Sequence, residues 1–271
     1  MDAMMMRMFG VAFLAGLLFS GPAVAEDLVT GLAVYEVGLD PSKGEGVASI
    51  SGTMSARLLR ECDTYVTEAE LEADLTGLDG ATLPLIVVSS HAETAKSLSF
   101  ELTTTLGGMQ VDHAAGTATR NDQGISVTLK EPTEREFTLE GDALFPVAML
   151  EAAIAAAKAG ETFREFSTFD GTGRGEEVWT VSVLITPVDE DDQDEEDALF
   201  AAGLGFEDMA RWRMALSYFP PGANGEQTPA FSTSMVVYEN GFAQAAVYDL
   251  GEVAMQLKLI EFSPIPPKPC P

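Results

Sequence analysis

Apolar and polar residues alternate with a period of two along most of this chain. Side chains of a β-strand point alternately to its two faces, so this alternation predicts strands with one buried face. Five apolar stripes of this kind are Leu98, Phe100 and Leu102; Ile125, Val127 and Leu129; Trp179, Val181, Val183 and Ile185; Trp212, Met214, Leu216 and Tyr218; and Val253, Met255, Leu257 and Leu259. The chain is therefore expected to be mainly β.

Short turn signals separate the stripes. Asn240-Gly241 is the strongest, because both residues tolerate the positive φ angles of a tight hairpin turn. Weaker signals are Asp79-Gly80, the segment 121–124 and Asp170-Gly171. Many short strands joined in this way predict one large antiparallel meander. A sheet of that size has to hide its apolar face and its edges, so we expect it to curl up or to close into a barrel.

One segment near the middle of the chain has helical periodicity instead. Pro146 suits a first helical turn, and Gly160 stands where a helix would stop, although Phe145 is a poor N-cap. The apolar face between them consists of Met149, Leu150, Ala153, Ile154 and Ala157. This predicts one mid-chain helix that packs against the sheet or plugs the mouth of the barrel. A weaker signal for a short helical turn covers residues 206–211.

The first residues are typical of a secretory signal peptide. Arg7 provides a positive start, residues 9–19 are small and apolar, and Ala23-Val24-Ala25 offers the small residues that a signal peptidase requires. We expect a signal peptide over residues 1–25, cleaved after Ala25, and a single exported domain over residues 26–271. An uncleaved N-terminal anchor helix is the alternative. No cysteine stands at the cleavage point, which argues against a lipid anchor.

The net charge narrows the range of partners. The chain has 43 acidic and 15 basic residues and a formal net charge of -28. A field this negative repels nucleic acid phosphates and anionic lipid headgroups, so no nucleic acid partner is expected. The hydrophobic fraction of 46% still provides ample material for a core.

The densest acidic run covers residues 189–197. An EF-hand loop counted from Asp189 would need glycine at its sixth position and glutamate at its twelfth, but these positions hold Asp194 and Phe200. Like charges at this density favour an extended, solvated loop between two strands. Weak and unspecific binding of divalent cations is the alternative.

Residues for catalysis are scarce. The two histidines, His91 and His113, form no HExxH pair and accompany no Gly-x-Ser-x-Gly elbow, so we expect solvated side chains in loops or at strand ends. The glycine-rich segment 171–175 is followed by a strand pattern rather than a helix, which predicts a hairpin connection rather than a phosphate loop. We predict no catalytic, cofactor-binding or metal-binding residues.

The two cysteines, Cys62 and Cys270, lie near opposite ends of the chain. Thiols exported to an oxidising compartment are usually found oxidised, so we expect one disulfide that brings the ends of the domain together. Two free or buried thiols are the alternative.

Several short motifs, taken in their order, resemble the EipB-type cell-envelope integrity proteins of alphaproteobacteria. The resemblance extends over nearly the whole chain after the signal peptide, and its order and cysteine placement make it more specific than any one motif. The motifs are Tyr35-Glu36-Val37, Ser51-Gly52-Thr53-Met54, Glu61-Cys62-Asp63, Leu144-Phe145-Pro146, Phe169-Asp170-Gly171, Val178-Trp179, Ser217-Tyr218-Phe219, Tyr238-Glu239-Asn240-Gly241 and the proline-rich tail with Cys270.

The resemblance implies a periplasmic overlapping β-spiral with little helix, bridged between Cys62 and Cys270 and without an established enzymatic activity. Two departures stand out. The chain reads Val147-Ala148-Met149 where the family pattern leads us to expect a threonine and a histidine, and the acidic run resembles an insertion. Neither departure affects the strand stripes or the cysteines.

Three classes of function stay open. The first is a non-enzymatic protein that supports the cell envelope by binding other periplasmic components, for example helical-repeat proteins. The second is a carrier that holds a lipid or another apolar ligand in the concavity of the broken barrel, because many strands share one apolar face. The third is an enzyme with paired carboxylates recruited from the 43 acidic residues.

Overall fold

The computed structural model describes residues 28–44, 46–189, 195–222 and 228–270. The expected signal peptide over residues 1–25 and its cleavage after Ala25 lie outside these residues. So does the central part of the acidic run, residues 190–194.

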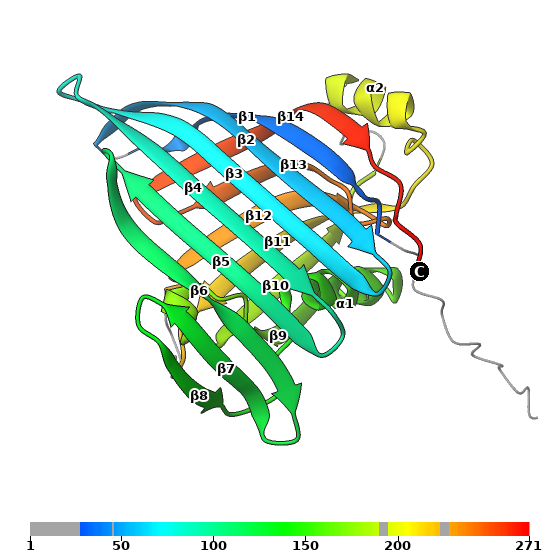
Figure 1. Cartoon of the computed structure of the whole chain (residues 1–271). Coiled ribbons are helices and arrows are strands. Elements are labelled where there is room, and N and C mark those ends of the chain that lie inside the picture. Colours follow the sequence, from blue (N-terminus) through cyan, green and yellow to red (C-terminus); the bar gives the residue numbers. More distant parts are fainter. Residues whose placement is uncertain (1–27, 45, 190–194, 223–227, 271) are drawn as a thin grey trace, which may run out of the picture.

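In this described part, fourteen strands form one sheet in the order β8-β7-β6-β5-β4-β3-β2-β1-β14-β13-β12-β11-β10-β9 (Figure 1). The strands are β1 (Gly31–Gly44), β2 (Val47–Glu61), β3 (Thr64–Gly77), β4 (Thr82–Glu93), β5 (Ser97–Leu106), β6 (Met109–Asn121), β7 (Gly124–Glu131), β8 (Arg135–Leu139), β9 (Phe163–Thr168), β10 (Trp179–Pro187), β11 (Arg211–Phe219), β12 (Phe231–Tyr238), β13 (Ala243–Asp249) and β14 (Val253–Pro264). Every neighbouring pair is antiparallel. The predicted antiparallel meander is therefore confirmed.

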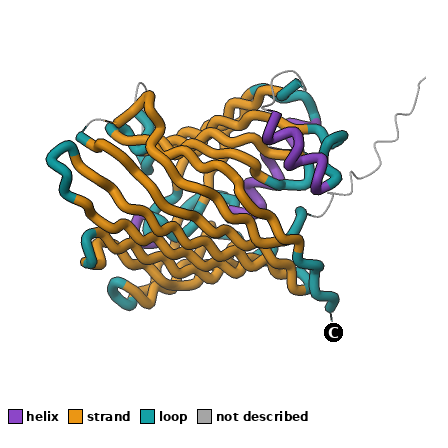
Figure 2. Tube along the Cα trace, turned by 90° about the horizontal axis from the view of Figure 1, so that it is seen from above, coloured by secondary structure: helices purple, strands orange, loops and turns teal. Residues whose placement is uncertain are grey.

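The apolar stripes face the interior because the strand registers align them. One row of cross-strand partners runs over β10–β14 and consists of Ile185, Met214, Met235, Ala246 and Leu257. The sheet curls around this face, so that its two arms lie opposite each other (Figures 1 and 2). The predicted turn at Asn240-Gly241 connects β12 to β13, with Gly241 at a φ of 81°.

The two edge strands, β8 and β9, are consecutive in the chain but lie at opposite ends of the sheet. The connection from β9 to β10 contains a 3₁₀ turn, η1 (Gly173–Gly175), and packs against the inward face of β5 and β7. A Cβ atom at Gly171 would lie 2.4 Å from the Phe100 ring, and one at Gly175 would lie 2.6 Å from Leu129. Glycine at these two positions permits the close approach that makes the spiral overlap. The segment is a hairpin connection, as predicted.

The mid-chain helix α1 (Pro146–Lys158) is confirmed and lies inside the curl. Its buried residues, among them Ile154 and Ala157, pack with the inward face of β10–β12 and with Leu58 and Tyr65 of the opposite arm. Gly160 follows its end with a φ of 78°, which is the left-handed conformation of a helix stop.

A second helix, α2 (Glu195–Leu204), was not predicted. The end of the acidic run begins this helix, so the expectation of a loop over residues 189–197 is wrong for residues 195–197. The expected short helical turn at residues 206–211 is present only as a single turn, closed by a hydrogen bond from Met209 N to Phe206 O at 3.1 Å, and not as a helix. Acidic residues are favourable at a helix N-terminus, and α2 is further held by buried Ala201 and by Phe206, whose ring lies 5.3 Å from that of Phe242. These long-range contacts are invisible in a local pattern.

The N-terminus of α1 is capped by a residue from another element. Phe145 occupies the N-cap position and provides no side-chain hydrogen bond. Instead, the Glu93 carboxylate of β4 accepts hydrogen bonds from the backbone N–H groups of Val147 at 2.8 Å and Ala148 at 2.9 Å. The Arg120 guanidinium packs over the ring of Phe145, 4.6 Å from its centre, in a cation–π contact beside the cap. Glu93 thus ties the helix to the sheet.

Replacing this carboxylate should destabilise the protein. Glu93 is only 4% exposed, so Glu93→Ala leaves two amide groups of α1 without a partner in a site from which water is excluded. We expect the free energy of unfolding to fall by about 1–3 kcal/mol, measured by urea denaturation. Glu101→Ala, at an exposed position of β5, is the matched control and should leave it nearly unchanged. Equal losses in both variants would contradict the capping role.

Burial also gives Glu93 a signature in the pH dependence of stability. Burial raises the pKa of its carboxyl group, against the opposing effects of the two amide hydrogen bonds and Arg120. The stabilisation that protonated Glu93 contributes is fully present below the pKa of the unfolded state. It is lost as the pH rises through the higher pKa of the folded state. Because Glu93→Gln lacks this component, the stability of the wild type relative to that variant should fall from acidic to neutral pH. A pH-independent difference in denaturation would contradict this expectation.

Candidate binding surfaces of the spiral

The interior of the curl is not uniformly packed. Inward-facing residues of β10 and β11, such as Val183 and Met214, are buried. On the opposite arm, the cross-strand partners Met54, Leu71 and Val87 of β2–β4 are only half-buried although they face the same interior. These apolar side chains are therefore only partly covered by the rest of the core.

A cavity of about 290 Å³ lies between α1 and the inward face of β1–β3. Ala33, Ala56 and Ala69 are direct cross-strand partners and form one row of small side chains along it, which we call the alanine row. Val147 and Leu150 of α1 lie on the opposite side. Further lining residues at the end of the cavity include Leu28, Phe242 and Phe262. This is a mainly apolar cavity inside the curl.

A larger cavity of about 700 Å³ is lined by residues of β11–β14 and β1 and by Asp197 of α2. Its lining mixes charges of both signs, with Arg213 and Lys258 on the strands and Glu36 and Asp197 beside them. The rest of the lining is a mixture of small polar and aliphatic side chains. Neither its charge nor its polarity selects one class of ligand.

The outward face of β3 and β4 combines acidic and exposed apolar residues. Glu70 is the cross-strand partner of Val88, and Glu72 is the partner of Ile86. Both glutamates are exposed, and so are Val88 at 41% and Ile86 at 37% of their surface. We call these four residues the β3–β4 strip. Ile86 and Val88 thus form a small apolar patch beside two carboxylates on a regular sheet.

Both histidines lie within strands, His91 close to the end of β4 and His113 on β6, so the expectation of loops is wrong, and His91 is not solvated as expected. His91 is on the inward face of β4, where its Nε2 atom lies 2.9 Å from the carbonyl oxygen of Asp170, and burial lowers the pKa of its imidazole. His113 is on β6, with its Nε2 atom 3.9 Å from Glu101. Among the described residues, no group of three or more His, Cys, Asp or Glu side chains could hold a metal ion.

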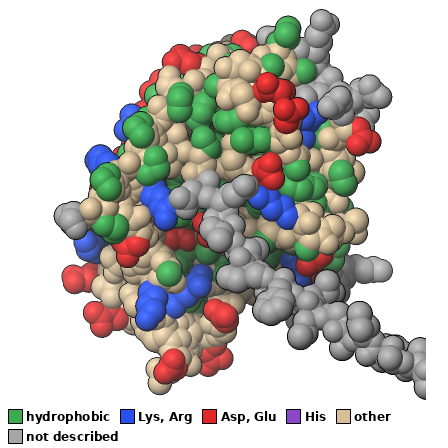
Figure 3. Space-filling view, turned by 90° about the vertical axis from the view of Figure 1, so that its right-hand side faces the viewer, with side chains coloured by type: hydrophobic (Ala, Val, Ile, Leu, Met, Phe, Trp, Pro, Cys, Tyr) green, Lys and Arg blue, Asp and Glu red, His purple; other side chains and the backbone are tan. Residues whose placement is uncertain are grey.

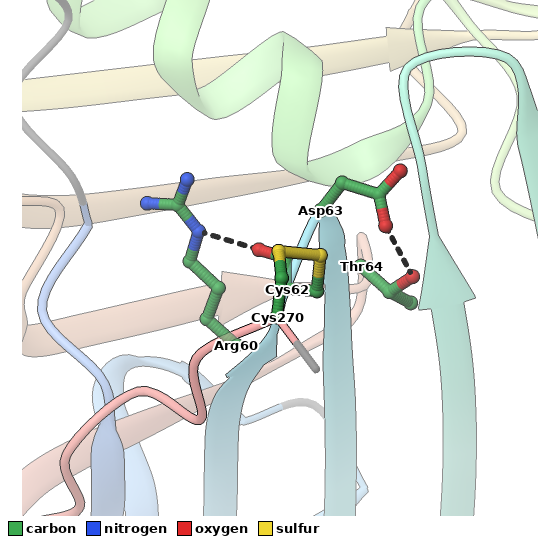
Figure 4. The surroundings of a disulfide bond; sticks show 5 residues. All are labelled: Arg60, Cys62, Asp63, Thr64 and Cys270. Atoms are coloured by element: carbon green, nitrogen blue, oxygen red, sulfur yellow. Dashed lines mark hydrogen bonds between the residues drawn. A yellow bond between two sulfur atoms is a disulfide. The ribbon is translucent and has the colours of Figure 1, made fainter.

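The structure joins Cys62 and Cys270 in a disulfide with a Cα–Cα distance of 4.5 Å (Figure 4). Cys62 lies in the turn between β2 and β3, and Arg60 donates a hydrogen bond from its Nε to the Cys62 carbonyl oxygen. Backbone hydrogen bonds hold the tail that leads to Cys270, from Cys62 N to Lys268 O at 3.0 Å and from Lys268 N to Arg60 O at 2.9 Å. The tail is thereby fixed across the end of β2.

Removing this bridge should lower the stability strongly. The cysteines are 208 residues apart, and closing a loop of that length stabilises a fold by roughly 5 kcal/mol in the chain-entropy model. We expect Cys270→Ser to melt at a lower temperature in calorimetry and to be degraded faster by proteases. Pro267→Ser, an exposed change in the same tail, keeps the bridge and serves as the control. Equal melting temperatures of the wild type with and without reductant would refute a stabilising role.

No helix among the described residues has the length and apolar character needed to cross a membrane.

A family model described as EipB-like matches residues 22–266. The cell envelope integrity protein EipB of Brucella abortus (strain 2308) is 24% identical over 253 residues, which cover 90% of this chain and 88% of that protein. Its name denotes an envelope protein and no enzymatic reaction.

A solved structure shows the same fold. The crystal structure of a β-barrel-like protein of a domain of unknown function from Brucella abortus superposes with a TM-score of 0.81 and 22% sequence identity. The match covers 89% of this chain and 100% of that one. Together with the family match over almost the whole sequence, this leads to one conclusion: the chain belongs to the EipB-like family.

Proposed function

We propose that the protein supports the integrity of the cell envelope from the periplasm by binding another envelope protein, without catalysing a reaction. The observation that carries this proposal is the β3–β4 strip, where the exposed aliphatic side chains of Ile86 and Val88 lie directly beside Glu70 and Glu72. Its location on β-strands gives the strip a fixed shape.

The chemistry of the strip defines the partner. Glu68, the next outward carboxylate on β3, is paired with Arg57 at 2.9 Å, whereas Glu70 and Glu72 face the aliphatic residues of β4 and no basic cross-strand neighbour. A matching surface would present basic side chains next to apolar ones. Complementary charges speed the association of the two proteins and fix their relative orientation, and the apolar contact adds affinity. A helical-repeat protein with basic residues on its exposed helices would meet these requirements.

Crosslinking in living cells tests this proposal. A photoreactive amino acid in place of Ile86 should give a discrete protein adduct in the envelope. The same amino acid at Thr119, an exposed outward position at the far end of β6, is the control and should not give it. The double variant Glu70→Lys/Glu72→Lys should lose the adduct and should not restore detergent resistance to a deletion strain.

A charge control separates loss of binding from loss of folding. Glu136→Lys changes an exposed residue of β8, the edge strand of the same arm, and should behave as the wild type. All variants are compared at equal melting temperature and periplasmic abundance. A protein adduct that is still formed by the Glu70→Lys/Glu72→Lys variant would contradict a protein partner at this strip. Capture of lipid alone at position 86 would contradict it as well.

A carrier of an apolar ligand is the second candidate. It is favoured by the half-buried inward residues of β2–β4 and by the mainly apolar cavity beside α1. Pockets that bind small apolar ligands are lined in this way. The two candidates use opposite faces of the same strands and do not exclude each other.

A further inference from the structure

We infer that the cavity between α1 and the alanine row is a binding site for a single acyl chain. This inference deepens the carrier function proposed above and rests on it. It names the residues that make the site and the part of the ligand that they accept.

The cavity exists because three small residues coincide across three strands. Ala33, Ala56 and Ala69 are in register on the inward face of β1, β2 and β3. The next row of inward-facing residues consists of Tyr35, Met54 and Leu71, which are much larger. Side chains of that size in the alanine row would fill the space in front of Val147 and Leu150. The small residues of the alanine row thus make room for the cavity at this point of the arm.

The polar side chains around the cavity already have partners. Arg57 and Glu68, which also line it, form an ion pair with each other at 2.9 Å. The Tyr35 hydroxyl donates a hydrogen bond to the carbonyl oxygen of Ala243 at 2.7 Å, and Thr67 Oγ1 lies 3.5 Å from His91 Nδ1. The backbone groups of β1–β3 are engaged in the sheet. A polar ligand group placed here would lose its hydration without gaining hydrogen bonds, whereas a hydrocarbon loses nothing. The site therefore selects for hydrocarbon.

The volume limits the size of the occupant. A cavity of about 150 Å³ lined by apolar residues holds a benzene-sized molecule, and pockets for entire drug-sized ligands start at about 300 Å³. At about 290 Å³, this cavity accommodates one aliphatic chain but not the several chains of a complete membrane lipid. The structure points to the acyl chain of a free fatty acid or of a single-chain lipid.

Fluorescence titration with cis-parinaric acid tests the site in protein secreted and purified from the periplasm. The wild type should bind the probe saturably. Ala56→Leu places a branched side chain in the cavity and should weaken binding at least about tenfold, equivalent to roughly 1.4 kcal/mol. Thr53→Leu adds similar bulk on the outward face of the same strand and should bind as the wild type. Ala69→Val provides a smaller filling change if Ala56→Leu lowers the melting temperature.

Competition identifies the source of the chain. Displacement of the probe by oleate alone indicates a free fatty acid, and displacement by both oleate and lysophosphatidylglycerol indicates any single-chain amphiphile; either result supports the inference. Saturable binding that is unchanged in both Ala56→Leu and Ala69→Val would overturn this site and leave the carrier function standing. An absence of probe binding, together with lipid-free protein in native mass spectrometry, would overturn both.

Discussion

The pairing of β1 with β14 is the interaction on which the rest of the structure depends. It joins the first and last strands of the chain in the middle of the sheet, so that the arm β2–β8 and the arm β9–β13 become one surface. Tyr35 faces Leu259 and Val37 faces Leu257 in this pairing, which continues the apolar inward face from one arm to the other. The disulfide between Cys62 and Cys270 holds the tail after β14 beside the start of β3 and reinforces the same junction.

The position of α1 follows from this junction. Both arms curl toward each other, and the helix that connects their outer edges lies in the interior between them. Its apolar face packs against β10–β12, and its N-terminus is held by Glu93 from the other arm. The helix fills one part of the interior and leaves the space in front of the alanine row. Figure 3 views the molecule from the right-hand side of Figure 1 and shows hydrophobic side chains together with charged ones of both signs on that face.

The two proposed binding surfaces lie on opposite faces of the same strands, because successive side chains of a strand point to opposite faces of the sheet. On β3, Glu70 and Glu72 point outward to the β3–β4 strip, while Ala69 and Leu71 point inward to the interior. A rigid sheet can thus present a charged and apolar surface to a protein partner and keep a hydrocarbon site on its other face. Neither surface requires a reactive group, in keeping with a relative that is named for envelope integrity.

The sequence by itself determined the elements that depend on local order. Strand stripes such as Val181 to Ile185, the turn at Asn240-Gly241 and the helix after Pro146 follow from side-chain period and turn chemistry, which involve only near neighbours. The exported pair of cysteines indicated the disulfide through its redox environment. The family resemblance added the overlapping spiral.

Only the tertiary structure decided which residues meet across strands. The register of β1–β3 aligns Ala33, Ala56 and Ala69, and the curl brings Glu93 to the amides of α1. The same long-range packing places His91 in the interior and turns the end of the acidic run into α2, in contrast to the expectations from the sequence. Each of these contacts joins residues far apart in the chain, and no local periodicity encodes their register.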